Sequence, residues 1–148
     1  MSLFQSAVLN KYLKDQNDAR VAAAYATFTA HFHDPSIQAN IREAKEEQYQ
    51  EGFLRDLFVN VLGYTLNPQK DYELTSEFKN EKGAKKADGA ILQKGKALAV
   101  IELKGTDTTD LQTINTQAFN YKANHTDCVY VITSNFHKLR FFIDNAVE

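Results

Sequence analysis

The hydrophobic and polar positions of the chain predict helices in its first part and strands in its second. Two helical stretches are expected, from about Leu3 to Phe32 and from about Ile37 to Leu62, each with a broad apolar stripe. Between them, Pro35 ends the first stretch because proline cannot continue a helix. We therefore expect an N-terminal helical segment, residues 1–36, that packs on a core domain formed by residues 37–148.

The second part of the chain alternates between strand patterns and one helical pattern. Five segments have the short apolar or alternating pattern of β-strands. They are Asp71–Phe78, Ala90–Leu92, Ala97–Ile101, Cys128–Thr133 and Leu139–Ile143. A helix is expected from the capping residues at 107–110 to about Asn124. This order predicts an α/β fold in which helices cover the faces of a mixed sheet. No terminal element is evident in residues 144–148, so we expect the chain to be a fragment of a longer protein.

The second and third of these strands carry the most informative chemistry. They flank the polar turn Gln93–Lys96, a pattern typical of a β-hairpin. The third strand is almost continuously apolar, yet it ends on Glu102-Leu103-Lys104. Buried charges are costly unless they are paired or bind a metal ion. Because side chains alternate along a strand, Glu102 and Lys104 are expected on one face and Leu103 on the other.

Asp88 lies on the first strand of the hairpin, and the register decides whether it joins Glu102. A two-residue loop at Lys94-Gly95 would place Asp88 opposite Ile101, on the other face. A three-residue loop would place Asp88 opposite Glu102, with both carboxylates on the same side. If these two carboxylates form a site, the hairpin must therefore have an odd-length loop or an equivalent bulge.

The composition excludes several classes of protein. The 148 residues suit one domain, and 43% of them are hydrophobic. The formal net charge of −2 shows no global basic field for nucleic acid, although a local basic patch can suffice. One cysteine, Cys128, rules out an internal disulfide framework and is expected to be a buried structural thiol. The sequence has no signal peptide and no apolar run of transmembrane length, so a cytoplasmic protein is expected.

Three further groups of side chains are candidates for function. Projecting the apolar face of the second helical stretch backwards brings Glu47 near the buried side, with Glu43 and Glu46 within one turn. This glutamate is either a boundary residue or a functional acid. Lysines cluster before the hairpin and form either a solvated turn or a patch that contacts phosphate. The members of that patch are Lys82, Lys85 and Lys86. His31 and His33 lie near a helix end without Cys or Asp partners, so a metal role is not expected for them.

Asp88, thirteen intervening residues and then Glu102-x-Lys104 resemble the PD-(D/E)xK nuclease superfamily. Ala87 stands where the proline is usual. Gln117 and Tyr121 resemble the QxxxY extension of one branch, which includes type I restriction subunits, RecB-like nucleases and type IIG restriction-modification enzymes. Several segments look like the N-terminal cleavage domain of type IIG enzymes in particular. They are Lys45–Gln50, Phe53-Leu54, Leu62–Tyr64, Tyr130–Asn135 and Leu139–Phe142.

The resemblance implies a restriction-endonuclease-like fold and a Mg²⁺-dependent DNA endonuclease, with Mn²⁺ as a possible substitute. It implies that Asp88, Glu102 and the Leu103 carbonyl bind the metal and that Lys104 orients or deprotonates the attacking water. Gln117 and Tyr121 would position Lys104 and the phosphate, and Glu47 would hold an outer-shell water or a second metal. The expected partners are double-stranded DNA, methyltransferase and target-recognition domains on the full-length chain, and a second copy in transient dimerisation.

Two alternatives to a type IIG cleavage module stay open. One is a stand-alone DNA repair or recombination nuclease. The other is a catalytically silent module of the same fold that binds nucleic acid or a partner protein. The DNA target is not indicated, because no segment resembles a base-reading helix with clustered Arg and Asn.

Overall fold

A mixed β-sheet with the predicted hairpin at its centre organises the computed structural model, which describes residues 4–144, 146 and 147. The strands follow one another across the sheet in chain order. They are β1 (Leu74–Lys79), β2 (Lys86–Gln93), β3 (Lys96–Leu103), β4 (Tyr130–Ser134), β5 (Leu139–Ile143) and β6 (Ala146–Val147). Only β3 and β4 pair in parallel, because helix α5 connects them; the other neighbours are antiparallel. The predicted α/β fold with a mixed sheet is confirmed.

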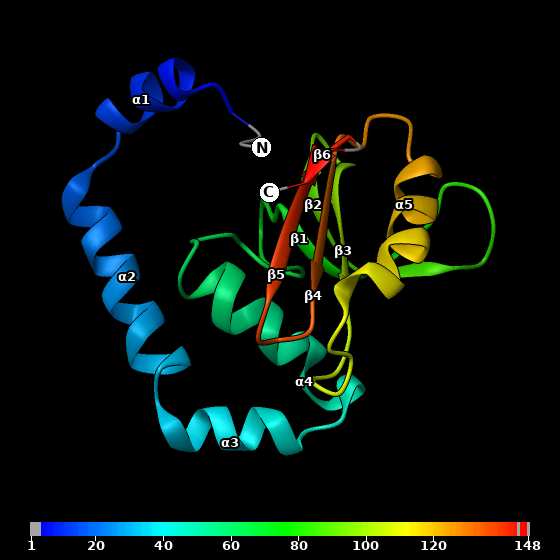
Figure 1. Cartoon of the computed structure of the whole chain (residues 1–148). Helices are drawn as coiled ribbons and strands as arrows, with labels where there is room; N and C mark the ends of the chain where they lie inside the picture. The colour runs from blue at the N-terminus through cyan, green and yellow to red at the C-terminus, as the bar shows by residue number, and fades with distance from the viewer. Residues whose placement is uncertain (1–3, 145, 148) are drawn as a thin grey trace.

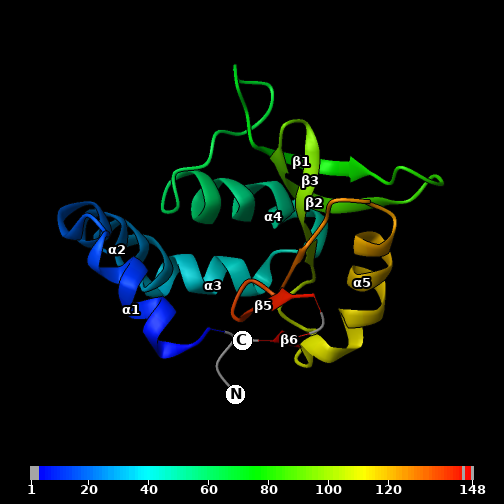
Figure 2. The same cartoon turned by 90° about the horizontal axis from the view of Figure 1, so that it is seen from above.

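Helices cover both faces of this sheet (Figures 1 and 2). The helical elements are α1 (Ser6–Lys14), α2 (Asp18–Phe32), α3 (Pro35–Glu43), α4 (Glu46–Phe53), the π-helical continuation of α4 (Leu54–Val59), a 3-10 turn (Leu111–Ile114) and α5 (Asn115–Ala123). On one face, α4 and its continuation bury Phe53, Leu54 and Phe58 against the sheet. On the other face, α5 buries Ala118 and Tyr121. The sheet is therefore sandwiched, and its alternating residues feed two separate hydrophobic clusters.

The hairpin joins β2 to β3 with a two-residue turn and a bulge. Lys94 and Gly95 both have positive φ angles, 51° and 78°, as a tight hairpin turn requires. With that turn alone, Asp88 would oppose Ile101. A bulge after Ile91 shifts the register by one residue, so Gly89 pairs with Ile101. The next pair along this register is Asp88 with Glu102. The predicted requirement for an odd-length loop or an equivalent bulge is thus confirmed, in the form of the bulge.

The N-terminal helices form an arc at one side of the molecule (Figure 1). The stretch predicted as one helix from Leu3 to Phe32 divides into α1 and α2, with Asn17 capping α2 through a bond from the Arg20 amide; Leu3 itself lies outside the described residues. No described residue of α1 or α2 is buried. Contact with the core comes from the last turns of α2, where Phe32 meets Phe53. The ring contacts with the core come from the end of α2, while Arg20 near the start of α2 lies close to Gly63.

The second predicted helix, Ile37–Leu62, is also interrupted. Asp34 caps α3 by accepting bonds from the amides of Ser36 and Ile37. The chain then becomes extended at Ala44 and Lys45 before α4 begins at Glu46. These breaks separate the helical stretch into two helices with independent orientations.

The end of the chain differs from the expectation that residues 144–148 carry no element. Ala146 and Val147 form β6, which pairs with Ile143 and Phe142 at the edge of the sheet. Asn145 and Glu148 lie outside the described residues. Among the residues that the structure describes, no helix is long and apolar enough to cross a membrane.

Candidate active site

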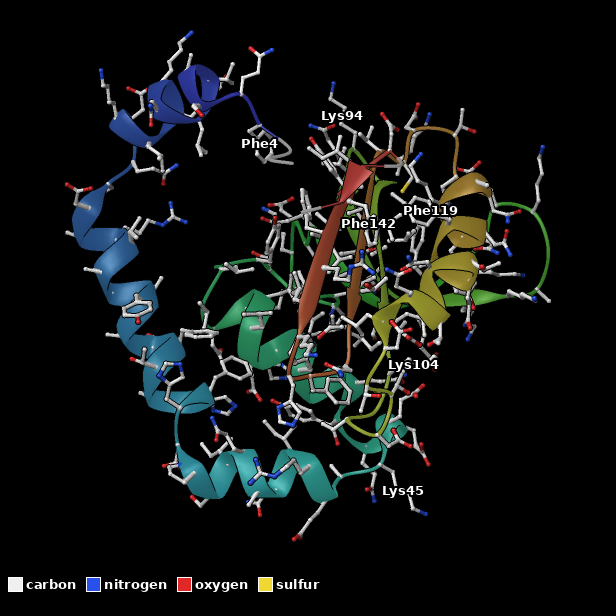
Figure 3. The ribbon with its side chains drawn as sticks, viewed as in Figure 1. Phe4, Lys45, Lys94, Lys104, Phe119 and Phe142 are labelled. Carbon is white, nitrogen blue, oxygen red and sulfur yellow. The ribbon has the colours of Figure 1, made fainter. Side chains whose placement is uncertain are left out.

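The end of β3 brings two opposite charges into the interior of the protein. Glu102 is 1% exposed, and its partner across the parallel pair with β4 is Thr133, which is fully buried. Lys104 follows one residue after the strand and donates from Nζ to Glu102 Oε1 at 3.1 Å. Figure 3 shows Lys104 where β3 ends, close to the first turn of α5. Alternation along the strand places both side chains on the α5 face, while Ile101 and Leu103 pack into the α4 cluster.

Asp88 joins this pair through the backbone of β3. Its Oδ2 accepts a hydrogen bond from the Leu103 amide at 2.7 Å, and Leu103 lies between Glu102 and Lys104 in the chain. The β1 residue opposite it, Glu77, has a φ of +50°, a conformation that side chains rarely adopt. The β1–β2 ladder is regular on both sides of this position, where Ser76 pairs with Gly89 and Phe78 with Ala87. The local distortion therefore lies beside the carboxylate.

A third acid reaches the site from the start of α4. Glu46 Oε1 lies 3.2 Å from Lys104 Nζ, and Glu46 Oε2 accepts a bond from the Gly105 amide at 3.3 Å. Glu47 is exposed, and no contact with Lys104 is present. The helical carboxylate at this site is therefore Glu46 rather than the predicted Glu47.

The physical reason for this one-residue difference is the π-helix that follows α4. The projection assumed α-helical rotation through the apolar residues from Phe53 onwards. In the π-helix Leu54–Val59 each residue advances less around the axis, so Leu57 and Phe58 lie further back than an α-helix would place them. The buried face consequently includes Glu46 and leaves Glu47 on its exposed margin.

The amide of Gln117 connects α5 to the carboxylates. Its Nε2 donates to Glu102 Oε1 at 2.6 Å and lies 3.2 Å from the Tyr121 hydroxyl. The four-residue spacing on one helix places Gln117 directly over Tyr121. Tyr121 is 7% exposed, while Gln117 is on the exposed part of the helix and reaches inward. Four segments of the chain, around residues 46, 88, 102 and 117, thus meet within one network.

The carboxylates of this network are held in an unfavourable environment. Burial, and then the negative charge of Asp88, raise the pKa of Glu102 from 4.5 to about 7. Burial also raises the pKa of Asp88, although the bond from the Leu103 amide and the charge of Lys104 oppose the rise. Burial alone would lower the pKa of Lys104, but Glu102 and Glu46 outweigh it and raise that pKa. The site therefore contains a cation and more acidic groups than that cation neutralises.

One oxygen of Glu102 has no partner. Oε2 is buried and makes no hydrogen bond, while Oε1 receives bonds from both Lys104 and Gln117. A buried oxygen without a donor is costly, and two things could satisfy it: a proton shared with the adjacent Asp88 carboxyl, or a bound cation. Oxygen donors from carboxylates and backbone carbonyls suit Mg²⁺, which retains several waters when bound by proteins. Among the described residues, no three His, Cys, Asp or Glu side chains form a metal-binding group. A metal here would therefore rely on Asp88, Glu102, backbone oxygen and water.

The remaining candidate residues divide between this site and other parts of the surface. Lys85 and Lys86 line a polar groove beside α5, and Lys86 also pairs with Glu77 at 3.2 Å. Lys82 is exposed and does not line the groove. His31 Nε2 lies 3.0 Å from Asp56 Oδ2 and links α2 to the π-helical continuation of α4. Cys128 is buried in the cluster beneath α5, as predicted.

Two residues of the site were not among the predicted ones. Glu46 was named only as a neighbour of Glu47, for the reason given above. Thr133 is fully buried beside Glu102, and its hydroxyl has no hydrogen-bond partner. A threonine in an apolar strand is an ordinary strand former, so no feature of the sequence distinguished it. Only the parallel pairing of β3 with β4 places it next to Glu102.

Comparison with known protein families gives a match over most of the chain. The family described as the type I restriction enzyme R protein N terminus matches residues 9–148, which include all of the residues of the site. Neither the curated proteins nor the solved structures contain a match.

Proposed function

The chain belongs to the family of type I restriction enzyme R protein N termini, and from this membership and the buried carboxylates we propose that it is a Mg²⁺-dependent DNA endonuclease domain. The observation that carries the proposal is the buried Oε2 of Glu102, which has no partner although two donors contact its neighbour Oε1. A purely structural ion pair has no reason to leave one oxygen unsatisfied in the interior.

Asp88, Glu102 and the Leu103 carbonyl are the groups that would hold the metal ion. The two carboxylates come from neighbouring strands, and the bond from the Leu103 amide fixes the orientation of Asp88. When bound, Mg²⁺ supplies polarisation of the phosphate and a lower pKa for the attacking water. A cation held there would lower the pKa of Glu102, because it would favour the ionised carboxylate against both burial and the repulsion from Asp88. Mn²⁺ prefers similar oxygen ligands and is expected to substitute.

Lys104 supplies fixed positive charge beside the reacting phosphate. Phosphodiester hydrolysis adds negative charge to the phosphate oxygens, and a positioned cation in a partly buried site stabilises that charge. Because Glu102 and Glu46 raise its pKa, Lys104 holds its proton at neutral pH. We therefore favour electrostatic stabilisation and orientation of the water by Lys104 over its action as a base.

Gln117 positions Glu102, and Glu46 positions Lys104. Gln117 bonds Glu102 Oε1 and leaves Oε2 without a hydrogen bond. Glu46 holds the ammonium of Lys104 from the opposite side. Tyr121 supports Gln117 through its hydroxyl. Such contacts matter because small displacements of reacting groups reduce rates strongly.

We also propose the type of restriction enzyme to which this domain belongs. The matched family favours the cleavage part of a type I restriction subunit acting on double-stranded DNA. A type IIG cleavage module, with methyltransferase and target-recognition domains on the full-length chain, is the second candidate and is favoured by the segments 130–135 and 139–142. In either arrangement one site cuts one strand, so cleavage of both strands needs transient dimerisation.

Metal binding and DNA cleavage test the proposal together. Calorimetry with Mg²⁺ is expected to detect a site that Asp88→Asn and Glu102→Gln both abolish, and that Glu47→Gln retains. Nicking of supercoiled plasmid in Mg²⁺ is likewise expected to be lost in Asp88→Asn and Glu102→Gln and kept in Glu47→Gln. A stand-alone repair nuclease would pass both tests but would also act on DNA ends. A chain that binds DNA without binding metal or cleaving would be a silent module, and the proposal would be wrong.

A further inference from the structure

A polar groove runs from the site along α5. One wall comes from the connection between β1 and β2, with Asn80, Lys85 and Lys86. The other wall is the outer side of α5, where Gln117 and Asn120 lie. Its volume of about 760 Å³ is within the range of ligand clefts, which is about 300–1,000 Å³. None of the described residues that line the groove is acidic.

Asn80 is the feature of this groove that most clearly indicates a ligand. It is 7% exposed, and its backbone N–H donates to the Lys85 carbonyl at 3.0 Å. Its side-chain Oδ1 is buried without a hydrogen-bond partner. Buried amide side chains normally satisfy their oxygen, and leaving it unpaired is costly. An asparagine amide also carries two donors, and rotation of the group exchanges the two ends. Asn80 can therefore meet either a donor or an acceptor of a ligand in the groove.

The groove adjoins the carboxylates through Gln117, which stands between the two. Gln117 and Tyr121 line it, and the same Gln117 amide donates to Glu102 at 2.6 Å. An extended ligand in the groove would therefore be separated from Glu102 by the Gln117 side chain. Lys85 and Lys86 stand on the opposite wall, where their charges compensate a run of phosphates.

The chemistry of the walls fits a nucleic-acid backbone. Amide, hydroxyl and ammonium groups are the ones that contact phosphate and sugar in protein–DNA complexes. The groove is the size of a small-molecule cleft, which cannot enclose a duplex but can hold a short length of one strand. We propose that it holds the strand that is to be cut, separated from its partner, beside the scissile phosphate. This inference rests on the proposed nuclease function and adds the path of its substrate.

Binding of single-stranded DNA tests the inference with two matched pairs of variants. Asn120→Asp places a negative charge in the groove, and Asn60→Asp places the same charge on an exposed residue after the π-helix. Lys85→Gln removes a groove cation, and Lys94→Gln removes an exposed cation from the β2–β3 turn. The probe is a short fluorescein-labelled oligonucleotide, measured by fluorescence anisotropy with Ca²⁺ in place of Mg²⁺ to slow cleavage.

Asn120→Asp is expected to weaken binding by about tenfold, the loss expected for a hydrogen bond to a charged group. Lys85→Gln is expected to weaken binding and to reduce the dependence of log K on log salt by about 0.7, the value for one single-strand phosphate contact. Asn60→Asp and Lys94→Gln are expected to bind like the unmodified chain. Equal affinities for the groove variants and their controls, or no binding by the unmodified chain, would overturn the inference.

Failure of the inference is distinguishable from failure of the proposed function. If Mg²⁺ binding and plasmid nicking depend on Asp88 and Glu102 while the groove variants bind normally, the nuclease stands and the strand takes another path. If the groove variants lose DNA binding but no metal binding or nicking is detected, the groove binds DNA and the nuclease proposal fails.

Discussion

Replacing Glu102 by glutamine should stabilise the metal-free protein at neutral pH, although Glu102 lies at the centre of the site. Its carboxyl group has a pKa of about 7 in the folded chain, against 4.5 for an ordinary glutamate, because burial and Asp88 disfavour its charge. The folded state therefore binds this proton more tightly than the unfolded state. Stability is greatest below about pH 4.5 and decreases as the pH rises to about 7.

The magnitude follows from the same two values. Each tenfold change in proton affinity corresponds to about 1.4 kcal/mol, so the rise to about 7 destabilises the ionised folded state by about 3 kcal/mol. The side chain is 1% exposed, so solvent screening does not reduce this effect. Glutamine keeps an oxygen for the bond from Gln117 and carries no charge, but it loses the ion pair with Lys104. The variant should therefore recover part of the 3 kcal/mol at neutral pH and none of it near pH 4.5.

Urea unfolding in EDTA at several pH values measures this effect. The free energy of unfolding of the unmodified chain should fall between about pH 4.5 and 7, and that of Glu102→Gln should fall less steeply. Glu47→Gln changes an exposed glutamate on the same helix as Glu46 and serves as the control. Parallel curves for all three proteins would refute the reasoning. Added Mg²⁺ should stabilise only the proteins that retain Glu102, by about 2.7 kcal/mol at one hundred times the dissociation constant.

Three further substitutions test how the site is supported. Glu46→Gln, which breaks the 3.2 Å pair with Lys104, should slow plasmid nicking more than Glu47→Gln does, as initial rates in Mg²⁺ will show. Leu54→Ala should lower the free energy of unfolding by about 2–5 kcal/mol, because Leu54 is fully buried; urea titration measures it. Gly89→Ala should cost about 1–3 kcal/mol in the same assay, since its Cβ would lie 3.2 Å from Leu54. Unchanged stability in either core variant would show that the π-helical continuation of α4 can shift relative to the sheet and absorb the change.

The strand-borne part of the site was predictable because strands impose a simple rule. Alternation alone places Glu102 and Lys104 on one face, and an apolar run that ends in two charges is visible without a structure. Asp88 was harder, because its face depends on a single residue of register. The bulge after Ile91 supplies that residue, and no residue type in the hairpin marks its position. The register that the site requires could be predicted from the sequence, but the position of the bulge that produces this register could not.

The helix-borne parts differ in how well they could be predicted. Gln117 and Tyr121 lie on a regular helix, so their four-residue spacing translates directly into a shared face. Glu46 precedes an irregular one, and the π-helical turn changes the angle between Glu46 and the apolar residues by an amount that a fixed rotation cannot reproduce. The N-terminal stretch was predicted to be helical, and α1 and α2 confirm this. Its apolar stripe predicts burial, yet α1 and α2 bury none of their described residues in this chain.

The irregularities whose positions the sequence did not mark, the bulge and the π-helix, lie in the elements that form the site. The bulge aligns Asp88 with Glu102, and Glu46 contacts Lys104 from the start of the helix that continues into the π-helix. Regular elements alone would have placed Asp88 on the opposite face and Glu46 away from the ammonium. Two carboxylates and a third acid around one cation are unfavourable for folding, so these distortions do not serve the stability of the metal-free chain. They are accounted for if the arrangement is completed by a cation and by the phosphate of a bound strand.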